Sequence, residues 1–318
     1  MIMSIAFMFP GQGSQSESML SELAQAYPIV KQRFEQASDI LGVNLWSYVT
    51  DNSTGQLDQT ANTQPILLAA SQACHDVLTQ EFPEIQPAFL LGHSLGEYSA
   101  LRIAEAMSFN EAITLTRHRG ELMQEAVEYG KGAMAAILGL EDEQVIHLCS
   151  DISDTVSAAN FNAPGQVVIA GEKQAVQEAI TLAKELGAKR AIELPVSVPS
   201  HCALMRPAAA KFGLYLEKVD WQLPLKTPVI HNVDAKTRTT KEGIISALGT
   251  QLYQPVQWVS CVEHIVLEGV KLCIELGPNK VLSGLNKRIH PELTNLPFNQ
   301  PNDLKAIESF LDQHLERT

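Results

Sequence analysis

The chain has 318 residues, of which 45% are hydrophobic and 19% charged, and this ordinary globular usage excludes bulk disorder. At about 100 to 200 residues per domain, the length predicts two domains or one large domain with a smaller insert. The net charge of −13 disfavours nucleic-acid binding, so an acidic partner must dock on a local basic patch. Five scattered cysteines without a C-x-x-C pair favour a reduced, cytoplasmic setting. No stretch has the ~18 to 20 apolar residues of a membrane-spanning helix, so no membrane association is expected.

The first part of the chain alternates between strand and helix patterns. Residues 5–9 form a short apolar run that Pro10-Gly11 ends, which is typical of a buried parallel strand. A helix is expected to begin at Pro65 and run to Leu78, because proline suits the first helical position. This alternation predicts an α/β fold, a hydrolase-like parallel sheet covered by helices. The other expected elements are a strand at 87–92 and helices at 19–41, 95–106 and 109–127.

Near Gly132 the pattern changes to the order βαββαβ, the split ferredoxin-like unit. We therefore expect a small subdomain at 130–197, inserted into a large domain made of 1–129 and 198–318. The polar tail after Pro301 is expected to be only partly ordered. The small subdomain is predicted to have strands at 133–139, 155–160, 166–171 and 189–194 and helices at 141–150 and 173–186. The large domain is then predicted to resume with helices from His201, at 241–253 and after Pro278, and strands at 227–231 and 271–275.

A G-x-S-x-G pattern spans Gly92, Ser94 and Gly96, between a predicted strand and a predicted helix. This is the context of a nucleophile elbow, in which a sharp turn projects the serine hydroxyl into a cleft. The alternative is a plain strand–helix turn. A serine nucleophile also needs a base, and nine histidines compete for that role.

Two of these histidines are candidates for the base. His201 is expected at a helix start, where the positive end of the dipole keeps the imidazole neutral, and His231 follows a strand. We favour His201. His93 is adjacent to the serine, so its side chain is expected to point elsewhere.

Arg119 lies on the apolar stripe of the helix predicted at 109–127, and no acid lies three or four residues away. An inward arginine needs a partner, which is either a distant carboxylate of the protein or a carboxylate of the substrate. The Gly-rich loop after the first strand lacks the third glycine of a dinucleotide fingerprint and the lysine of a P-loop. Gln12 in this loop could donate to a developing oxyanion, although a flexible turn is the simpler interpretation.

Together these segments resemble the malonyl-CoA:acyl carrier protein transacylase family over nearly the whole chain and in the right order. The segments that carry the resemblance are FPGQGSQ at 9–15, GHSLGEYSAL at 92–101, RGELMQEAV at 119–127, NAPGQVVIAG at 162–171, PVSVPSHCALM at 195–205 and YQPVQW at 253–258. The family's hydrolase-like domain with a ferredoxin-like insert agrees with the boundaries above. This sequence differs from the usual family pattern at Arg102, Glu105, Gln254 and Asn279, none of which is a reacting group.

The resemblance implies a role for each matching residue. Ser94 is the nucleophile, His201 the base and Arg119 the clamp for the malonyl carboxylate. The remaining implied site residues are Gln12 and the Leu95 N–H as oxyanion hole, a backbone carbonyl near Gln251 that orients His201, and Gln64 and Asn162 as site lining.

The implied reaction is transfer of the malonyl group from malonyl-CoA to the phosphopantetheine thiol of acyl carrier protein, by a monomer with no metal or bound cofactor. A serine hydrolase such as a thioesterase shares the elbow, and a non-catalytic carrier-binding module is a second alternative. The best local basic candidates for docking an acidic carrier are Lys189-Arg190 and Lys287-Arg288, although solvated surface pairs would look the same.

Overall fold

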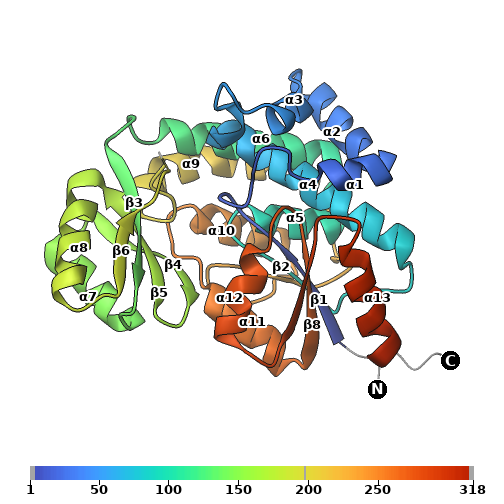
Figure 1. Cartoon of the computed structure of the whole chain (residues 1–318). Coiled ribbons are helices and arrows are strands. Elements are labelled where there is room, and N and C mark those ends of the chain that lie inside the picture. Colours follow the sequence, from blue (N-terminus) through green and yellow to red (C-terminus); the bar gives the residue numbers. More distant parts are fainter. Residues whose placement is uncertain (1–3, 197, 315–318) are drawn as a thin grey trace.

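The computed structural model describes residues 4–196 and 198–314 and contains a large α/β domain beside a smaller antiparallel sheet (Figure 1). The large domain is built on a five-stranded sheet in the order β7-β2-β1-β8-β9, in which every neighbouring pair is parallel. The predicted parallel sheet is therefore confirmed. Its strands are β1 (Ser4–Phe9), β2 (Phe89–Gly92), β7 (Val229–Ile230), β8 (Val270–Leu276) and β9 (Thr294–Phe298).

Side chains of β1 alternate between two apolar cores, as the period of two in a strand requires. Phe7 and Phe9 belong to the larger core, whereas Ala6 and Met8 face a second core on the other side of the sheet. Both faces are thus buried, which explains why the strand is a continuous apolar run. The larger core is covered by α1 (Ser21–Ala26), α2 (Pro28–Leu41), α4 (Thr60–Glu81), α5 (Gly96–Ile103), α6 (Phe109–Glu125), α9 (Arg206–Leu216), α10 (Lys241–Gln251) and α13 (Asp303–His314), and the second core by α11 (Trp258–Leu267) and α12 (Val281–Ile289).

The smaller sheet has the order β4-β5-β3-β6, with antiparallel neighbours throughout. One face packs on two helices around an apolar core of its own, and the other face turns toward the large domain (Figure 1). The backbone of Val256 bonds Ala159 and Phe161 and so ties the two parts together. The elements are β3 (Gly132–Leu138), α7 (Asp142–Ile152), β4 (Val156–Ala163), β5 (Gln166–Glu172), α8 (Lys173–Glu185) and β6 (Arg190–Glu193).

The predicted start of a helix at Pro65 is wrong, because Pro65 lies inside α4, which begins at Thr60. Proline has no N–H for the carbonyl four residues earlier, which belongs to Ala61. Arg117 from α6 donates to that carbonyl at 3.4 Å and to Asn62 Oδ1 at 2.6 Å. A partner from a distant helix thus compensates for the bond that the proline removes.

Other local predictions also fail where long-range packing decides. The tail after Pro301 forms helix α13 up to His314, because Ile307 and Leu311 are buried one turn apart in the main core. The helix expected from His201 begins only at Arg206, after a 3-10 turn at Ala203–Met205. The patterns also missed α3 (Leu45–Thr50), α11 and β9. No helix within 4–196 and 198–314 is long and apolar enough to cross a membrane.

Candidate active site

Ser94 lies at the sharp turn between β2 and α5, with a left-handed backbone at φ 53°. The flanking glycines allow this turn. A Cβ on Gly92 would lie 1.9 Å from the backbone of Gly96, and a Cβ on Gly96 would lie 1.9 Å from the Phe9 carbonyl oxygen. Both distances are far below van der Waals contact, so the predicted elbow depends on both glycines.

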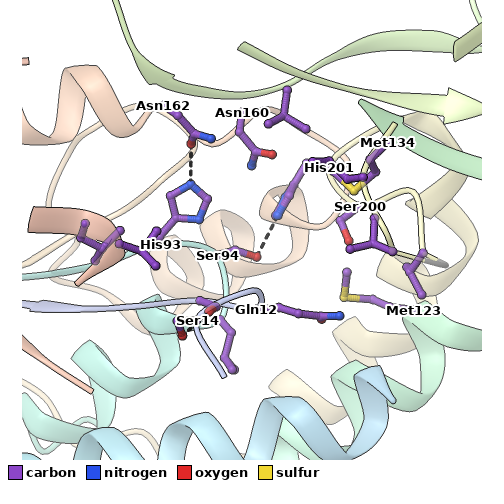
Figure 2. Close-up of a pocket in the computed structure, with 18 of the residues that line it drawn as sticks. Gln12, Ser14, His93, Ser94, Met123, Met134, Asn160, Asn162, Ser200 and His201 are labelled. Carbon is purple, nitrogen blue, oxygen red and sulfur yellow. Dashed lines mark hydrogen bonds between the residues drawn. The ribbon is translucent and has the colours of Figure 1, made fainter. Parts of the chain in front are cut away.

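Ser94 and His201 are brought together from different elements (Figure 2). Ser94 Oγ lies 2.8 Å from His201 Nε2, and His201 Nδ1 donates to the Gln251 carbonyl oxygen at 2.7 Å. His201 also has a left-handed backbone, at φ 63°, and its N–H donates to the Leu252 carbonyl oxygen at 3.0 Å. These bonds hold Nε2 toward the serine, which is the arrangement a general base needs.

The environment keeps His201 neutral, but a helix dipole is not the cause. Burial, followed by the nearby charge of Arg119, lowers the pKa of His201 to about 3. The expected position at a helix start is wrong, because only the 3-10 turn follows directly. His201 is therefore an unprotonated base at neutral pH for electrostatic reasons that the sequence pattern did not indicate.

Arg119 is 1% exposed and reaches Ser94 from α6. Its Nη2 lies 3.1 Å from Ser94 Oγ and donates to Gln251 Oε1 at 2.9 Å, while Nη1 donates to Gln64 Oε1 at 2.8 Å. The guanidinium also lies 5.0 Å from the centre of the Tyr98 ring. Within the described residues no carboxylate forms a salt bridge with it. Amide oxygens thus hold the arginine and leave its charge available.

A cleft of about 200 Å³ opens in front of these groups, between the large domain and the small sheet (Figure 2). Gln12 and Leu95 both line it, as expected, and the Gln12 amide donates to Thr60 Oγ1 at 3.1 Å. Leu95 lies at the start of α5, where the first N–H groups of a helix have no partner within it. The cleft is further lined by Ser14, Met123, Met134, Asn160, Asn162, Val168, Val198 and Ser200.

His93 lines the same cleft, so the prediction that it points elsewhere is wrong. Its Nε2 donates to Asn162 Oδ1 at 2.8 Å, and its ring lies 5.6 Å from that of Trp258. Burial lowers the pKa of His93. Contacts from distant segments, Asn162 and Trp258, hold the His93 ring there, and its position next to Ser94 in the sequence did not reveal them. Asn162 lines the cleft as expected, whereas Gln64 lies behind it and acts on Arg119 instead.

His231, the alternative base, lies behind the elbow with no exposed surface. Its Nδ1 donates to Glu97 Oε1 at 2.6 Å. The next residue, Asn232, accepts from the Ser94 N–H through Oδ1 and donates to the Gly92 carbonyl oxygen through Nδ2, both at 2.7 Å. Sequence reasoning missed Glu97 and Asn232, which brace the elbow from behind.

The two basic pairs lie on different elements. Arg190, the first residue of β6, is in register with Leu138, which is in register with Gln166, and Arg288 from α12 donates to Gln166 Oε1 and to the Pro164 carbonyl oxygen. Arg288 therefore connects α12 with the small sheet. Lys189, Arg190, Lys287 and Arg288 are all exposed.

The four departures from the family pattern leave the site geometry intact. Glu105 has φ 61°, which explains the glycine usual there, and its carboxylate bonds Lys226 at 3.0 Å. Asn279, also left-handed at φ 64°, donates to the Ser14 carbonyl oxygen at 2.6 Å. Arg102 is half-buried at the end of α5, and Gln254 lines a groove outside the cleft.

Comparison with known proteins agrees with this geometry. The family described as acyl transferase domain matches residues 6–292, so the fold and the serine–histidine site define the class as an acyltransferase. The chain is 50% identical over 308 residues to the malonyl CoA-acyl carrier protein transacylase of Haemophilus influenzae, which covers 96% of this chain and 98% of the relative. The Escherichia coli K12 transacylase is 49% identical over 303 residues, covering 95% and 97%. The chain belongs to the malonyl CoA-acyl carrier protein transacylase family.

Solved structures support the same assignment. The acyl carrier protein S-malonyltransferase of Vibrio cholerae is similar with a TM-score of 0.91 and 51% identity, covering 96% of this chain and 99% of that one. A malonyl-transacylase solved in complex with a type II PKS acyl-carrier protein gives a TM-score of 0.93 and 48% identity, covering 96% and 99%.

Proposed function

We propose that the protein transfers the malonyl group of malonyl-CoA to the phosphopantetheine thiol of acyl carrier protein, supplying extender units for fatty-acid or polyketide synthesis. The observation that carries this proposal is Arg119, a buried cation within hydrogen-bond distance of the Ser94 hydroxyl and held by amides instead of a carboxylate. A guanidinium in this position suits an acyl group that carries a carboxylate of its own.

The first half-reaction loads the serine. His201 Nε2 takes the proton of Ser94 Oγ as the oxygen attacks the thioester carbon of malonyl-CoA. The Leu95 N–H and the Gln12 amide hold the oxyanion that forms; one Gln12 hydrogen donates to Thr60, and the other remains for this role. The C–S bond then breaks, and the CoA sulfur takes the proton from His201.

The second half-reaction reverses these roles. The thiol of the carrier's phosphopantetheine gives its proton to His201 and attacks the malonyl-serine ester. The C–O bond breaks, and Ser94 recovers the proton. His201 works with a backbone carbonyl in place of a third carboxylate, because Gln251 O holds its Nδ1. This sequence of steps requires no metal or resident cofactor.

A thioesterase-type hydrolase remains the alternative. It would share the Ser94–His201 pair but use water as acceptor, and it would gain nothing from Arg119. The test is incubation with labelled malonyl-CoA, with and without holo-carrier. We expect a malonyl adduct on the wild-type protein, its transfer to the carrier, and neither with Ser94→Ala. An adduct on Ser94→Ala contradicts the nucleophile, and label released mainly to water contradicts the transferase.

The organisation of the chain supports three further parts of this proposal. The element order and the strand order β4-β5-β3-β6 are those of a ferredoxin-like unit, which we place at 130–197 between the two halves of the large domain. Lys189 and Arg190 lie at the start of β6, and Lys287 and Arg288 lie on α12, which contributes to the cleft; these basic pairs would attract an acidic carrier. Five buried, free cysteines fit a monomer working in a reducing cytoplasm.

A further inference from the structure

A buried carboxylate lies behind the elbow and is not used by the mechanism above. Glu97 follows Gly96 in the first turn of α5 and has no exposed surface. Its Oε2 accepts from the Asn232 N–H at 2.9 Å and from Gln251 Nε2 at 2.8 Å, and its Oε1 accepts from His231 Nδ1 at 2.6 Å. An ionised carboxylate removed from water is costly unless donors and an opposite charge compensate it.

His231 fits this site as a neutral donor. Its Nε2 is buried and has no hydrogen-bond partner among the residues that the structure describes. A charged imidazolium would place an N–H there with nothing to accept it, whereas the neutral tautomer with its proton on Nδ1 leaves only a lone pair. The positive charge that compensates Glu97 therefore has to come from elsewhere.

Arg119 is the buried cation on the far side of Gln251. The Gln251 amide donates from Nε2 to Glu97 and accepts through Oε1 from Arg119 Nη2 at 2.9 Å. The same Nε2 also donates to the Ser94 carbonyl oxygen at 2.9 Å. Glu97 and this carbonyl together fix which end of the amide faces the arginine, because a reversed amide would direct its NH2 group at the guanidinium. The same Gln251 holds His201 through its backbone carbonyl.

We propose that Glu97 is a positioning residue that balances the charge of Arg119 through the Gln251 amide and so keeps the guanidinium without a direct carboxylate partner until substrate binds. This proposal rests on the proposed function, in which Arg119 binds the malonyl carboxylate. A carboxylate in direct contact would occupy the guanidinium, and no carboxylate at all would leave a buried charge unbalanced in the empty site.

Glu97→Gln removes the charge and keeps the bonds from Gln251 and Asn232 to its amide oxygen. Its NH2 can donate to His231 Nδ1 only if the His231 proton moves to Nε2, which has no acceptor among the described residues, so the variant also lowers stability. The ratio of two substrates measured on one variant cancels this cost and reports the electrostatic effect of Glu97. Its negative charge competes with the substrate carboxylate for Arg119, so we expect the ratio of malonyl to acetyl loading rates to rise about threefold or more.

The experiment measures acyl-enzyme formation from malonyl-CoA and acetyl-CoA by mass spectrometry, together with melting temperatures, for Glu97→Gln, Arg119→Ala and the double variant. We expect each single change to lower the melting temperature and the double variant to lose less than the sum of the two, because neither charge is then left alone. Glu275→Gln is the matched control. Glu275 is equally buried but accepts from Leu282 and Ser283 in α12, so its effect should simply add to that of Arg119→Ala and leave the ratio unchanged.

Equal losses of malonyl and acetyl loading in Glu97→Gln would overturn the proposal, and so would purely additive melting temperatures. If Glu97→Gln alone does not fold, the double variant decides: a folded double variant supports charge balance, and an unfolded one refutes it. Failure of the proposed function is distinguishable, because the wild-type protein would then form no malonyl adduct or would release it to water instead of passing it to holo-carrier.

Discussion

Replacing Arg119 with alanine tests whether its guanidinium binds the substrate carboxylate or only supports the fold. The side chain is 1% exposed, and its Nη2 lies 3.1 Å from Ser94 Oγ. Alanine removes the charge and leaves the amide oxygens of Gln64 and Gln251 without their donor. The two interpretations differ in what they predict for substrates with and without a carboxylate.

The structure sets the size of the expected effect. Removing one partner of a hydrogen-bonded charge pair in a largely desolvated site costs about 2 to 5 kcal/mol. Since 1.4 kcal/mol is tenfold, kcat/KM for malonyl-CoA should fall about 30-fold to a few thousandfold. Acetyl-CoA has no carboxylate to lose. Its loading should stay constant or rise, because its methyl group would no longer face a buried charge at Arg119.

The assay compares the rates of acyl-enzyme formation from both substrates on the same variant. Arg117→Ala is the matched control, since Arg117 lies two residues earlier on α6 and bonds Glu121 at 2.6 Å, away from the cleft. Because Arg117 also donates to Ala61 and Asn62 in α4, its loss should lower the melting temperature, but it should change the ratio of the two rates by less than about threefold. Parallel losses of malonyl and acetyl loading in Arg119→Ala, with the ratio unchanged as in Arg117→Ala, would mean that Arg119 is structural.

Three other outcomes are expected. Burial and Arg119 lower the pKa of His201 to about 3, so the pH–rate profile of loading should show no inflection near pH 6.5. The melting temperature should instead fall as the pH is lowered from 6.5 toward 3, because the unfolded chain binds a proton that the folded site excludes. An inflection near 6.5 contradicts this. Replacing Lys287 and Arg288 with alanine should raise the carrier KM and weaken its salt dependence without affecting malonyl loading, and equal damage to both half-reactions contradicts docking. No single Asp or Glu to amide change in the large domain should match the loss in His201→Ala, because a backbone carbonyl holds Nδ1; one match with the fold intact would restore a triad.

Local sequence patterns were sufficient for the parallel sheet and for part of the site. The apolar run at 5–9 indicates a strand buried on both faces, and the two cores on either side of β1 show why. The spacing of Gly92, Ser94 and Gly96 indicates the elbow, because steric contact at both glycines leaves no alternative residue. The apolar stripe of α6 placed Arg119 inside, since helical period alone decides which face is buried.

Patterns failed where a distant partner compensates for a local defect. Pro65 indicates a helix start by its own chemistry, and only Arg117 on another helix makes it acceptable inside α4. His201 is expected at a helix start whose dipole keeps its imidazole neutral, yet burial and a neighbouring cation set its basicity. Neither partner is visible from the residues that surround these positions in the sequence.

Arg119 is a third residue whose charge partner lies outside its own sequence neighbourhood. No acid on α6 lies within reach of this arginine, and the sequence left open whether a distant carboxylate or the substrate pairs with it. The structure joins the two possibilities, because Glu97 lies one amide away and, among the described residues, no carboxylate forms a salt bridge with Arg119. An acid in the first turn of a helix is ordinarily explained by the helix dipole, so Glu97 carried no distinguishing signal. What distinguishes it is complete burial, which follows from Gln251 and Asn232 closing over it from segments more than 130 residues along the chain.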